Sequence, residues 1–256
     1  MPDYVRYLAE FRKQIEEGYS QHAYLNHLVS SVRTVEERAS ILLKGYGPAG
    51  AQVLSEGTAP PKPYAVSTRL VETYDVGFRV EVRDWAKAPE GLLTETLMEQ
   101  IATKIAENEV LVLVEGLAKN AGKQVQATNA LRLSKADLRS AIQWIGNNGF
   151  QPNRVLVSPE LESQLMLKNE LLEKWHFSSS TEDWGSHYSG KIDGLDLFWD
   201  YSLTGRAIVY ESYNVTFAKT DLKVTFDDMQ NPNQLIVQSW CSCAPLDERS
   251  VALITV

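Results

Sequence analysis

The sequence predicts an α+β fold, with helices packed on a mixed sheet and no repeated βαβ rhythm. Apolar and polar residues alternate over residues 76–82, which is the two-residue period of a strand with one covered face. From residue 93 the apolar residues recur every four positions, which is typical of a helix. Short apolar runs fill the last quarter of the chain, and the candidate strands there are residues 195–199, 207–211, 215–218, 222–226, 235–241 and 251–256.

The composition places the chain among ordinary globular proteins. Its 256 residues suffice for one large domain or two small ones, and 44% of them are hydrophobic and 23% charged. No apolar run is long enough to span a membrane, and the N-terminus lacks the apolar core of a signal peptide. Two cysteines exclude a disulfide scaffold. The net charge of −8, with no basic patch, argues against strong direct binding of nucleic acid.

The first part of the chain, residues 3–44, is predicted to be helical, with breaks at Gly18 and at residues 30–31. Its apolar stripe is narrow and begins with Tyr4, Leu8, Phe11 and Ile15. Such a stripe on a terminal segment is expected to dock on the chain's own body or on a sister subunit. Docking of a foreign cargo is the alternative.

Residues 45–50 spell G-x-G-x-x-G, the fingerprint of a dinucleotide site. That site needs a strand before the glycines and a helix after them, whereas a helical run is predicted at residues 36–44 and a Pro- and Gly-rich segment follows. We therefore predict a plain turn, with residues 56–63 as an extended linker. No cofactor is expected.

The central stretch, residues 64–117, organises the rest of the chain. Residues 65–73 and 76–82 are predicted to pair as a long hairpin with its tip at residues 74–75. After a break at residues 89–91, a helix over residues 92–117 would be about 39 Å long. A long hairpin that leads into a long helix has little core of its own, so the hairpin is expected to lie on a neighbouring subunit.

The segment after this helix begins with a polar and irregular stretch, residues 119–131. Ser134 and Asp137 then resemble a capping box that opens a helix, which ends near residues 147–149. A short buried strand at residues 154–158 leads through Pro159 into a second helix. Residues 178–190 are predicted to form a loop by their composition.

The residues that usually carry chemistry form no recognisable constellation, so no catalytic, metal or cofactor-binding residue is predicted. The four histidines fit no metal-binding motif, and Cys241 and Cys243 are expected to pack under the sheet. No nucleophile elbow and no P-loop occur. An α+β enzyme or ligand-binding module, folded as a compact monomer or dimer, remains a remote alternative.

The order of elements resembles the Hong Kong 97 phage-type capsid fold, which tailed bacteriophages share with encapsulins. Residues 107–110 with 115–116, 153–159, 190–195 and 205–209 carry the likeness in detail. The resemblance implies an N-terminal arm at residues 1–63, a projecting hairpin called the E-loop at 64–91, a spine helix and the first part of a peripheral domain at 92–130, an axial domain at 131–234, and strands returning to the peripheral domain at 235–256.

Under this resemblance the functional residues are those that contact other subunits. The implied E-loop contacts are Arg69, Val71, Tyr74, Val76, Phe78, Arg79, Val80 and Arg83. Trp184, His187 and Tyr188 would gather around a five- or six-fold axis, and Tyr4, Leu8, Phe11 and Ile15 would be contacts of the arm. Deleting residues 71–83 is expected to leave a folded protein that no longer closes into shells.

The resemblance also implies the partners. The chain would assemble with itself, as pentamers with or without hexamers, into an icosahedral shell. As a major capsid protein it would enclose double-stranded DNA, act with a portal, with or without a scaffolding protein, and assemble in the host cytoplasm. As an encapsulin it would enclose a cargo enzyme. The long arm and its Pro-rich linker favour the viral interpretation, and neither interpretation involves a membrane.

Overall fold

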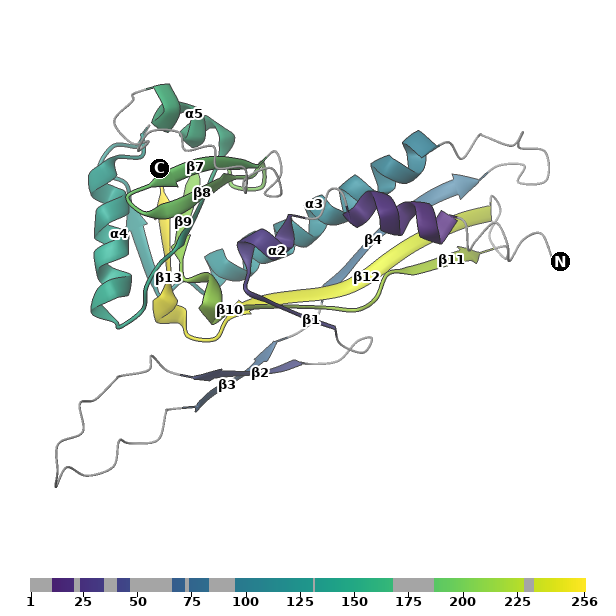
Figure 1. The fold of residues 1–256 in the computed structure, drawn as a ribbon, viewed down its shortest axis with the longest axis horizontal. Helices are drawn as coiled ribbons and strands as arrows, with labels where there is room; N and C mark the ends of the chain where they lie inside the picture. The colour runs from purple at the N-terminus through teal and green to yellow at the C-terminus, as the bar shows by residue number, and fades with distance from the viewer. Residues whose placement is uncertain are drawn as a thin grey trace.

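The structure is a computed structural model that describes residues 11–20, 24–34, 41–46, 66–71, 74–82, 95–130, 132–167, 187–227 and 233–256. A long helix runs beside a five-stranded sheet, and a six-stranded sheet with its own helices lies at one end of that layer (Figure 1). A separate two-stranded sheet lies to one side.

The long helix α3 spans Glu95–Lys119, which confirms the predicted spine helix over the described residues. Its 25 residues give a length of about 37 Å. Successive buried residues line the face that it turns to the protein, and they are Met98, Ile101, Ala102, Ile105, Val110, Leu113, Val114 and Leu117. The four-residue apolar period therefore marks a buried face, as the sequence predicts.

The five-stranded sheet is built on one long strand, β12 (Asn233–Pro245). Its other strands are β1 (Ser31–Thr34), β4 (Tyr74–Val82), β10 (Val215–Lys219) and β11 (Lys223–Asp227). Antiparallel β10 and β11 pair with successive parts of β12, antiparallel β4 pairs with residues 233–241, and β1 is parallel to β10. Helix α3 packs on β12 and β4.

The six-stranded sheet has the order β5-β13-β9-β6-β8-β7. Its strands are β5 (Lys123–Gln126), β6 (Arg154–Val157), β7 (Tyr188–Ile192), β8 (Leu195–Trp199), β9 (Arg206–Tyr210) and β13 (Val251–Thr255). Helices α4 (Lys135–Asn147) and α5 (Pro159–Leu167) belong to this part, where their apolar residues share one core with the sheet. Short helical turns also occur at Leu25–Leu28 (α2), Ser212–Asn214 (η3) and Glu248–Ser250 (η4).

Helix α4 begins with the predicted capping box. The Ser134 hydroxyl accepts a hydrogen bond of 3.2 Å from the Asp137 amide, and the Asp137 carboxylate accepts one of 3.0 Å from the Ser134 amide. After the helix ends, Gly149 takes a φ of 87°, a conformation that glycine adopts without strain. The sequence therefore predicts both this helix and the two hydrogen bonds of its capping box.

The predicted pairing of residues 65–73 with 76–82 is wrong. The first limb is β3 (Val66–Val71), which pairs antiparallel with β2 (Ile41–Tyr46), whereas β4 pairs with β12. A two-residue period identifies a strand but does not choose its partner, which is set by tertiary packing. The deletion of residues 71–83 would therefore remove a strand of the five-stranded sheet, so it does not test the projecting hairpin.

The arm is less helical than predicted. Residues 11–20 and α2 are helical, but residues 31–34 form β1 and residues 41–46 form β2. Both strands are held by partners that are distant in the sequence, β10 and β3. Backbone pairing at this distance overrides a weak local helical pattern.

The predicted domain boundaries also need correction. Strands β10 and β11, which were placed in the axial domain, belong to the five-stranded sheet. The last strand, β13, lies between β5 and β9 in the six-stranded sheet and not in the five-stranded sheet of β12, although β13 also contacts α3. Strand β5 lies within residues 119–131, which were predicted to be irregular, and β7 begins within the predicted loop at residues 178–190. Within the described residues, no helix is long and apolar enough to cross a membrane.

Candidate functional site

The helix at residues 11–20 docks on the spine helix of its own chain (Figure 1). Ile15 is fully buried among Met98, Ile101, Ala102 and Ile105, with Val237 of β12, and Phe11 packs against the same cluster. A Cβ atom at Gly18 would lie 3.1 Å from the Cβ of Ala102, so the glycine allows the two helices to approach closely. Phe11 and Ile15, which were predicted as arm contacts, thus contact their own chain.

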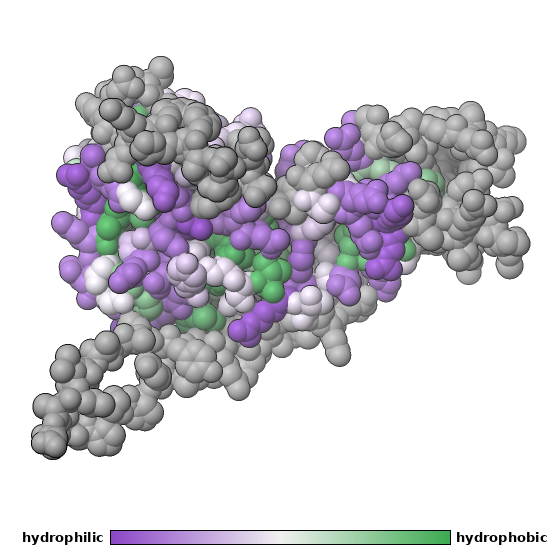
Figure 2. Space-filling model, in the orientation of Figure 1, coloured by the Kyte–Doolittle hydropathy of each residue, from purple (hydrophilic) through white to green (hydrophobic). Residues whose placement is uncertain are grey.

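The outer face of this helix is charged. Arg12 and Glu16 form an ion pair of 2.7 Å, and Lys13 and Glu17 form one of 3.8 Å. Figure 2 shows hydrophilic residues over this face and over the outer side of α4. The helix is therefore amphipathic in the expected sense, with its apolar side against α3.

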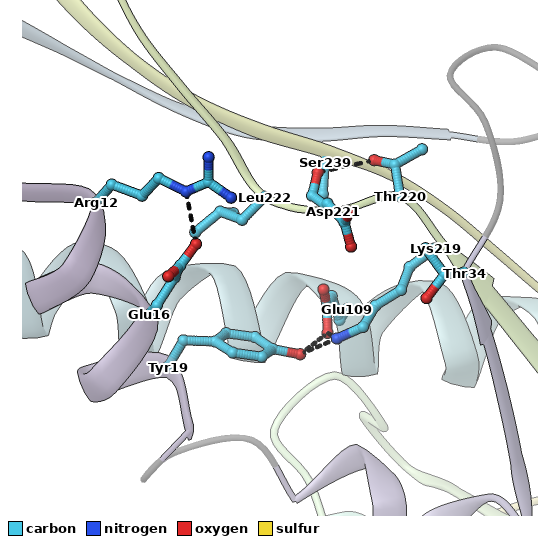
Figure 3. A pocket seen from close by; sticks show the side chains of 10 residues that line it. All are labelled: Arg12, Glu16, Tyr19, Thr34, Glu109, Lys219, Thr220, Asp221, Leu222 and Ser239. Carbon is cyan, nitrogen blue, oxygen red and sulfur yellow. Dashed lines mark hydrogen bonds and ion pairs between the residues drawn. The ribbon is translucent and has the colours of Figure 1, made fainter. Parts of the chain in front are cut away.

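A small cavity lies where the helix meets the five-stranded sheet (Figure 3). Its volume is about 180 Å³. The lining comes from the helix, β1, α3, β10, β12 and the segment joining β10 to β11, and consists of Arg12, Glu16, Tyr19, Thr34, Glu109, Lys219, Thr220, Asp221, Leu222 and Ser239. Charged groups of both signs thus face a space between the arm and the body.

Three of these residues form a polar cluster at the inner side of the cavity (Figure 3). The Tyr19 hydroxyl donates a hydrogen bond to Oε2 of Glu109, and Nζ of Lys219 donates one to the Tyr19 hydroxyl oxygen. Lys219 Nζ also lies 3.4 Å from Glu109 Oε2 and 4.5 Å from the centre of the Tyr19 ring. The cluster therefore connects the helix at residues 11–20, here called the arm helix, with the spine helix and β10.

Burial dominates the electrostatics of this cluster. Glu109 is only 2% exposed, and burial raises the pKa of its carboxyl above the ordinary value of 4.5, although the positive charge of Lys219 and the hydrogen bond from Tyr19 oppose the rise. Burial also raises the pKa of Tyr19, and the negative charge of Glu109 adds to the effect. Tyr19 therefore stays protonated and acts as a donor.

The next part of the arm, residues 24–34, ties the two sheets together. Towards the six-stranded sheet, Arg154 Nε donates to the carbonyl of His27 at 3.1 Å and the Tyr210 hydroxyl donates to the carbonyl of Leu28 at 3.0 Å. Tyr24 donates to the buried carboxylate of Asp200. The chain then enters the five-stranded sheet as β1, so one short segment bridges both sheets.

Two of the residues predicted to gather at a symmetry axis are engaged inside their own chain. The His187 ring stacks on Tyr24 with a centroid distance of 4.1 Å, and its Nδ1 lies 3.0 Å from the carbonyl oxygen of Trp199. The Tyr188 hydroxyl lies 3.5 Å from Asp196 and its ring contacts Phe198. Trp184 lies outside the described residues, as do Tyr4 and Leu8 of the arm.

The structure separates the residues predicted for the E-loop. Arg69 and Val71 lie on β3, and Arg83 lies outside the described residues. The others lie on β4 in the five-stranded sheet, and they are Tyr74, Val76, Phe78, Arg79 and Val80. The hairpin that stands apart from the larger sheets is β2–β3, whose strands are connected through residues 47–65.

The G-x-G-x-x-G segment begins inside this hairpin. A strand precedes the second glycine, contrary to the predicted helix, because Gly45 and Tyr46 belong to β2. That strand pairs antiparallel with β3, the next strand in the sequence, whereas a dinucleotide site is built on parallel strands joined by a helix.

Cys241 and Cys243 are buried on β12 as predicted. No group of three metal-ligating side chains occurs in the part of the chain that the structure describes.

The polar cluster was missed by sequence reasoning. Tyr19 and Lys219 lie 90 and 110 residues from Glu109 in the sequence, so no local motif connects them. One signal was present: Glu109 follows Ile105 by four positions and precedes Leu113 by four, so a carboxylate interrupts the buried stripe of the spine helix. A charged residue at a buried position indicates a partner from another element.

No protein-family model matches the sequence, and no curated protein matches it. Solved structures do match over most of the chain. A virus-like particle protein from Pyrococcus furiosus is 10% identical with a TM-score of 0.64, and the match covers 97% of this chain and 99% of that one. The capsid of the cyanophage P-SCSP1u is 13% identical with a TM-score of 0.58, and the match covers 88% and 85%.

The holo-SrpI encapsulin complex from Synechococcus elongatus PCC 7942 is 16% identical, with a TM-score of 0.58 and coverage of 91% and 86%. At these identities the likeness shows the fold. The chain therefore has the Hong Kong 97 phage-type capsid fold, as its order of elements predicts, with an arm, a projecting hairpin, a spine helix and two sheet-based parts.

Proposed function

We propose that this protein is a structural shell protein that assembles with copies of itself into a closed icosahedral container. The observation that carries the proposal is the fold match over 97%, 88% and 91% of the chain to a virus-like particle, a phage capsid and an encapsulin. Within the described residues, no cluster of candidate metal ligands suggests a metal-dependent activity. A structural role in assembly is supported by these fold matches.

The β2–β3 hairpin supports the proposal from the structure itself. Two strands alone are at best marginally stable in water, and both outer edges of such a ribbon carry unpaired backbone groups. Six antiparallel residue pairs, from Ile41 with Val71 to Tyr46 with Val66, hold the hairpin as its own sheet. We propose that it lies over a neighbouring subunit, in the role that the sequence analysis gave to residues 64–91.

The hairpin can be removed cleanly because Ile41 and Val71 are paired neighbours. A variant in which a short Gly-Ser linker replaces residues 42–70 should fold, because the five- and six-stranded sheets keep all their strands. We expect this variant to remain as unassembled subunits or capsomers when examined by sedimentation and negative-stain microscopy. Closed shells of the parent size from the variant would exclude the hairpin as an inter-subunit element.

For the contents of the shell, we propose a double-stranded DNA genome, which would be packaged without sequence-specific contacts. A chain with a net charge of −8 does not bind DNA tightly, so a capsid of this protein, assembled in the host cytoplasm with or without a scaffolding protein, would need a portal to be filled. Particles isolated from the natural source should then hold nuclease-protected DNA. Particles with the ultraviolet absorbance of protein alone would contradict a genome-filled shell.

An encapsulin shell that encloses a cargo enzyme is the second candidate. The cavity between the arm helix and the five-stranded sheet favours the encapsulin interpretation. Its volume is about 180 Å³, and its walls are polar and charged. An extended segment of a cargo protein could be recognised there. Co-purification of one enzyme with nuclease-resistant, DNA-free particles would decide for this candidate.

A further inference from the structure

The cavity beside the arm helix has a buried hydroxyl in its wall that lacks a partner. Ser239 lies on β12 and is 2% exposed, and within the described residues its hydroxyl makes no hydrogen bond. The side chain faces the spine helix, because Val237, two residues earlier on the same strand, packs on the α3 cluster. A buried polar group costs stability unless it is hydrogen-bonded. The hydroxyl therefore points to an occupant of the cavity that has a hydrogen-bonding group.

The cavity also presents a carboxylate without an ion pair. Asp221 lines it, and Figure 3 shows the side chain pointing into the space. Among the described residues Asp221 forms no ion pair, and although it acts on Arg12, that guanidinium is paired with Glu16 at 2.7 Å. Lys219 lies 3.4 Å from Glu109. Each positive charge of the lining is thus held by a carboxylate other than Asp221.

The segment that carries Asp221 is held beside Ser239 by the backbone. The Thr220 amide donates to the carbonyl of Trp240 at 2.9 Å, and the Trp240 amide donates to the Thr220 hydroxyl at 3.0 Å. That hydroxyl in turn donates to the carbonyl of Asp221 at 3.2 Å. These bonds continue the register of β10 with β12, in which Lys219 pairs with Cys241, and so place Asp221 across from Ser239.

The remaining features of the cavity limit the size and nature of a ligand. Leu222 lines the cavity and packs on the α3 cluster, so an apolar chain would find a partner there. The volume of about 180 Å³ lies below the range of about 300–1,000 Å³ that is usual for larger ligands. In the part of the chain that the structure describes, no three metal-ligating side chains are grouped as a metal ion requires. A small organic cation with a short alkyl chain meets all these conditions.

We propose that this cavity binds an alkylammonium group. The Asp221 carboxylate is its counter-ion, the Ser239 hydroxyl oxygen accepts one of its N–H groups, and Leu222 contacts the alkyl chain. An ammonium group has three donors and no acceptor, so it satisfies a carboxylate and a hydroxyl oxygen together.

An alkylammonium group can come from a free amine or from the lysine side chain of a polypeptide. The site lies within one chain and does not depend on shell assembly. Its occupation by the lysine of a cargo segment would rest on the second candidate function, whereas occupation by a free amine would not.

Saturation-transfer NMR on the full chain tests the site, with n-butylammonium chloride as the probe. The signal should saturate with concentration at neutral pH and give one dissociation constant. The controls are n-butanol, which lacks the charge, and sodium butyrate, which carries the opposite charge, and neither should show saturable binding. No saturable binding of n-butylammonium, or equally tight binding of butyrate, would overturn the proposal.

Asp221→Asn removes the counter-ion. It should raise the dissociation constant of n-butylammonium about tenfold, because the hydrogen bond loses its charged acceptor. Glu160→Gln is the matched control, since it removes an exposed carboxylate from α5, outside the cavity, and it should bind the probe like the parent. An unchanged dissociation constant in Asp221→Asn would refute the site.

Ser239→Ala separates a ligand contact from a merely structural one. It should raise the dissociation constant about threefold to tenfold, yet the urea midpoint should not fall, because the variant removes a buried hydroxyl that has no partner within the described residues. Ser242→Ala is the matched control: Ser242 is as buried on β12, its hydroxyl also lacks a partner among these residues, and it does not line the cavity. Equal affinities for the probe in the two variants would overturn the role of Ser239.

The two sources of the group are distinguished with Nα-acetyl-lysine N-methylamide. Tighter binding of this blocked lysine than of n-butylammonium would assign the site to a lysine of a polypeptide segment, whereas equal or weaker binding would assign it to a free amine. Both results keep the alkylammonium site. Because the titrations can use unassembled chains or particles, failure of this site and failure of shell assembly are distinguishable.

Discussion

Gly116 of the spine helix lies directly against the backbone of Cys243 on β12. A Cβ atom built at Gly116 would collide with the carbonyl oxygen of Cys243 and lie 3.0 Å from the Cys243 Cβ. The absence of a side chain at this position therefore sets the distance between α3 and the central strand. Since β12 pairs with three other strands, this contact positions the helix on the whole sheet.

Gly116→Ala should therefore destabilise the protein. We expect a loss of about 1–3 kcal/mol from forced overpacking, which exceeds the gain of about 1 kcal/mol in helix propensity. Gly146→Ala in α4 is the matched control, because no atom lies within 4 Å of the added Cβ, and it should be neutral or slightly stabilising. Urea unfolding of both variants checks the prediction, and equal effects would refute the close contact.

The bridge formed by residues 24–34 can be tested with a pair of tyrosines. Tyr210→Phe removes the buried hydrogen bond to the Leu28 carbonyl and leaves that oxygen unsatisfied, which should cost about 1–3 kcal/mol. Tyr213 is 75% exposed, so Tyr213→Phe should change the unfolding midpoint little. If the two variants unfolded alike, the tyrosine would not anchor the arm.

The capping box of α4 gives a prediction on stability and one on pH. Ser134→Ala should cost about 0.5–2 kcal/mol, whereas Ser140→Ala, an exposed position inside the same helix, should be neutral or better. A thermal melt in which both variants shift equally would contradict the cap.

Burial opposes ionisation of Asp137, but hydrogen bonds from Ser134 and Thr128 outweigh it and lower the pKa of Asp137 below the ordinary 3.8. A lowered pKa in the folded state contributes stability above 3.8, and this contribution is lost as the pH falls through the lowered value. Asp137→Asn should thus be less stable than the parent at pH 7, with a smaller difference near pH 2, as measured by urea unfolding at both pH values.

Local patterns were sufficient to predict most elements of this fold. The buried stripe of α3, the capping box of α4 and the alternation in β4 each arise from residues that are close in the sequence. Most of the late strands were predicted within a few residues of their bounds, because each is a short apolar run between turns.

Strand partners could not be predicted in the same way. The choice of β12 for β4, and of β2 for β3, depends on contacts between segments that are far apart in the sequence. The same reason explains why β1 and β2 were taken for helix and why β13 was assigned to the peripheral domain, although it pairs in the six-stranded sheet. A projecting hairpin was expected, and the structure has one in β2–β3. It lies about twenty-five residues earlier in the chain than predicted, because β4 pairs with β12 and not with β3.

The polar cluster was harder still to predict. Tyr19, Glu109 and Lys219 meet only when the arm, the spine helix and β10 are assembled. Glu109 interrupts the apolar stripe of the spine helix, which indicates that its carboxylate has a polar partner, but the sequence does not show which residue that partner is.

The central claim is that the chain encloses a space by assembling with itself. The most direct test is to purify the protein expressed alone, separate it by size, and image the largest species by negative-stain microscopy. The account predicts closed, uniform shells built of many copies. A monodisperse monomer or dimer, with no particles over a range of protein and salt concentrations, would contradict it.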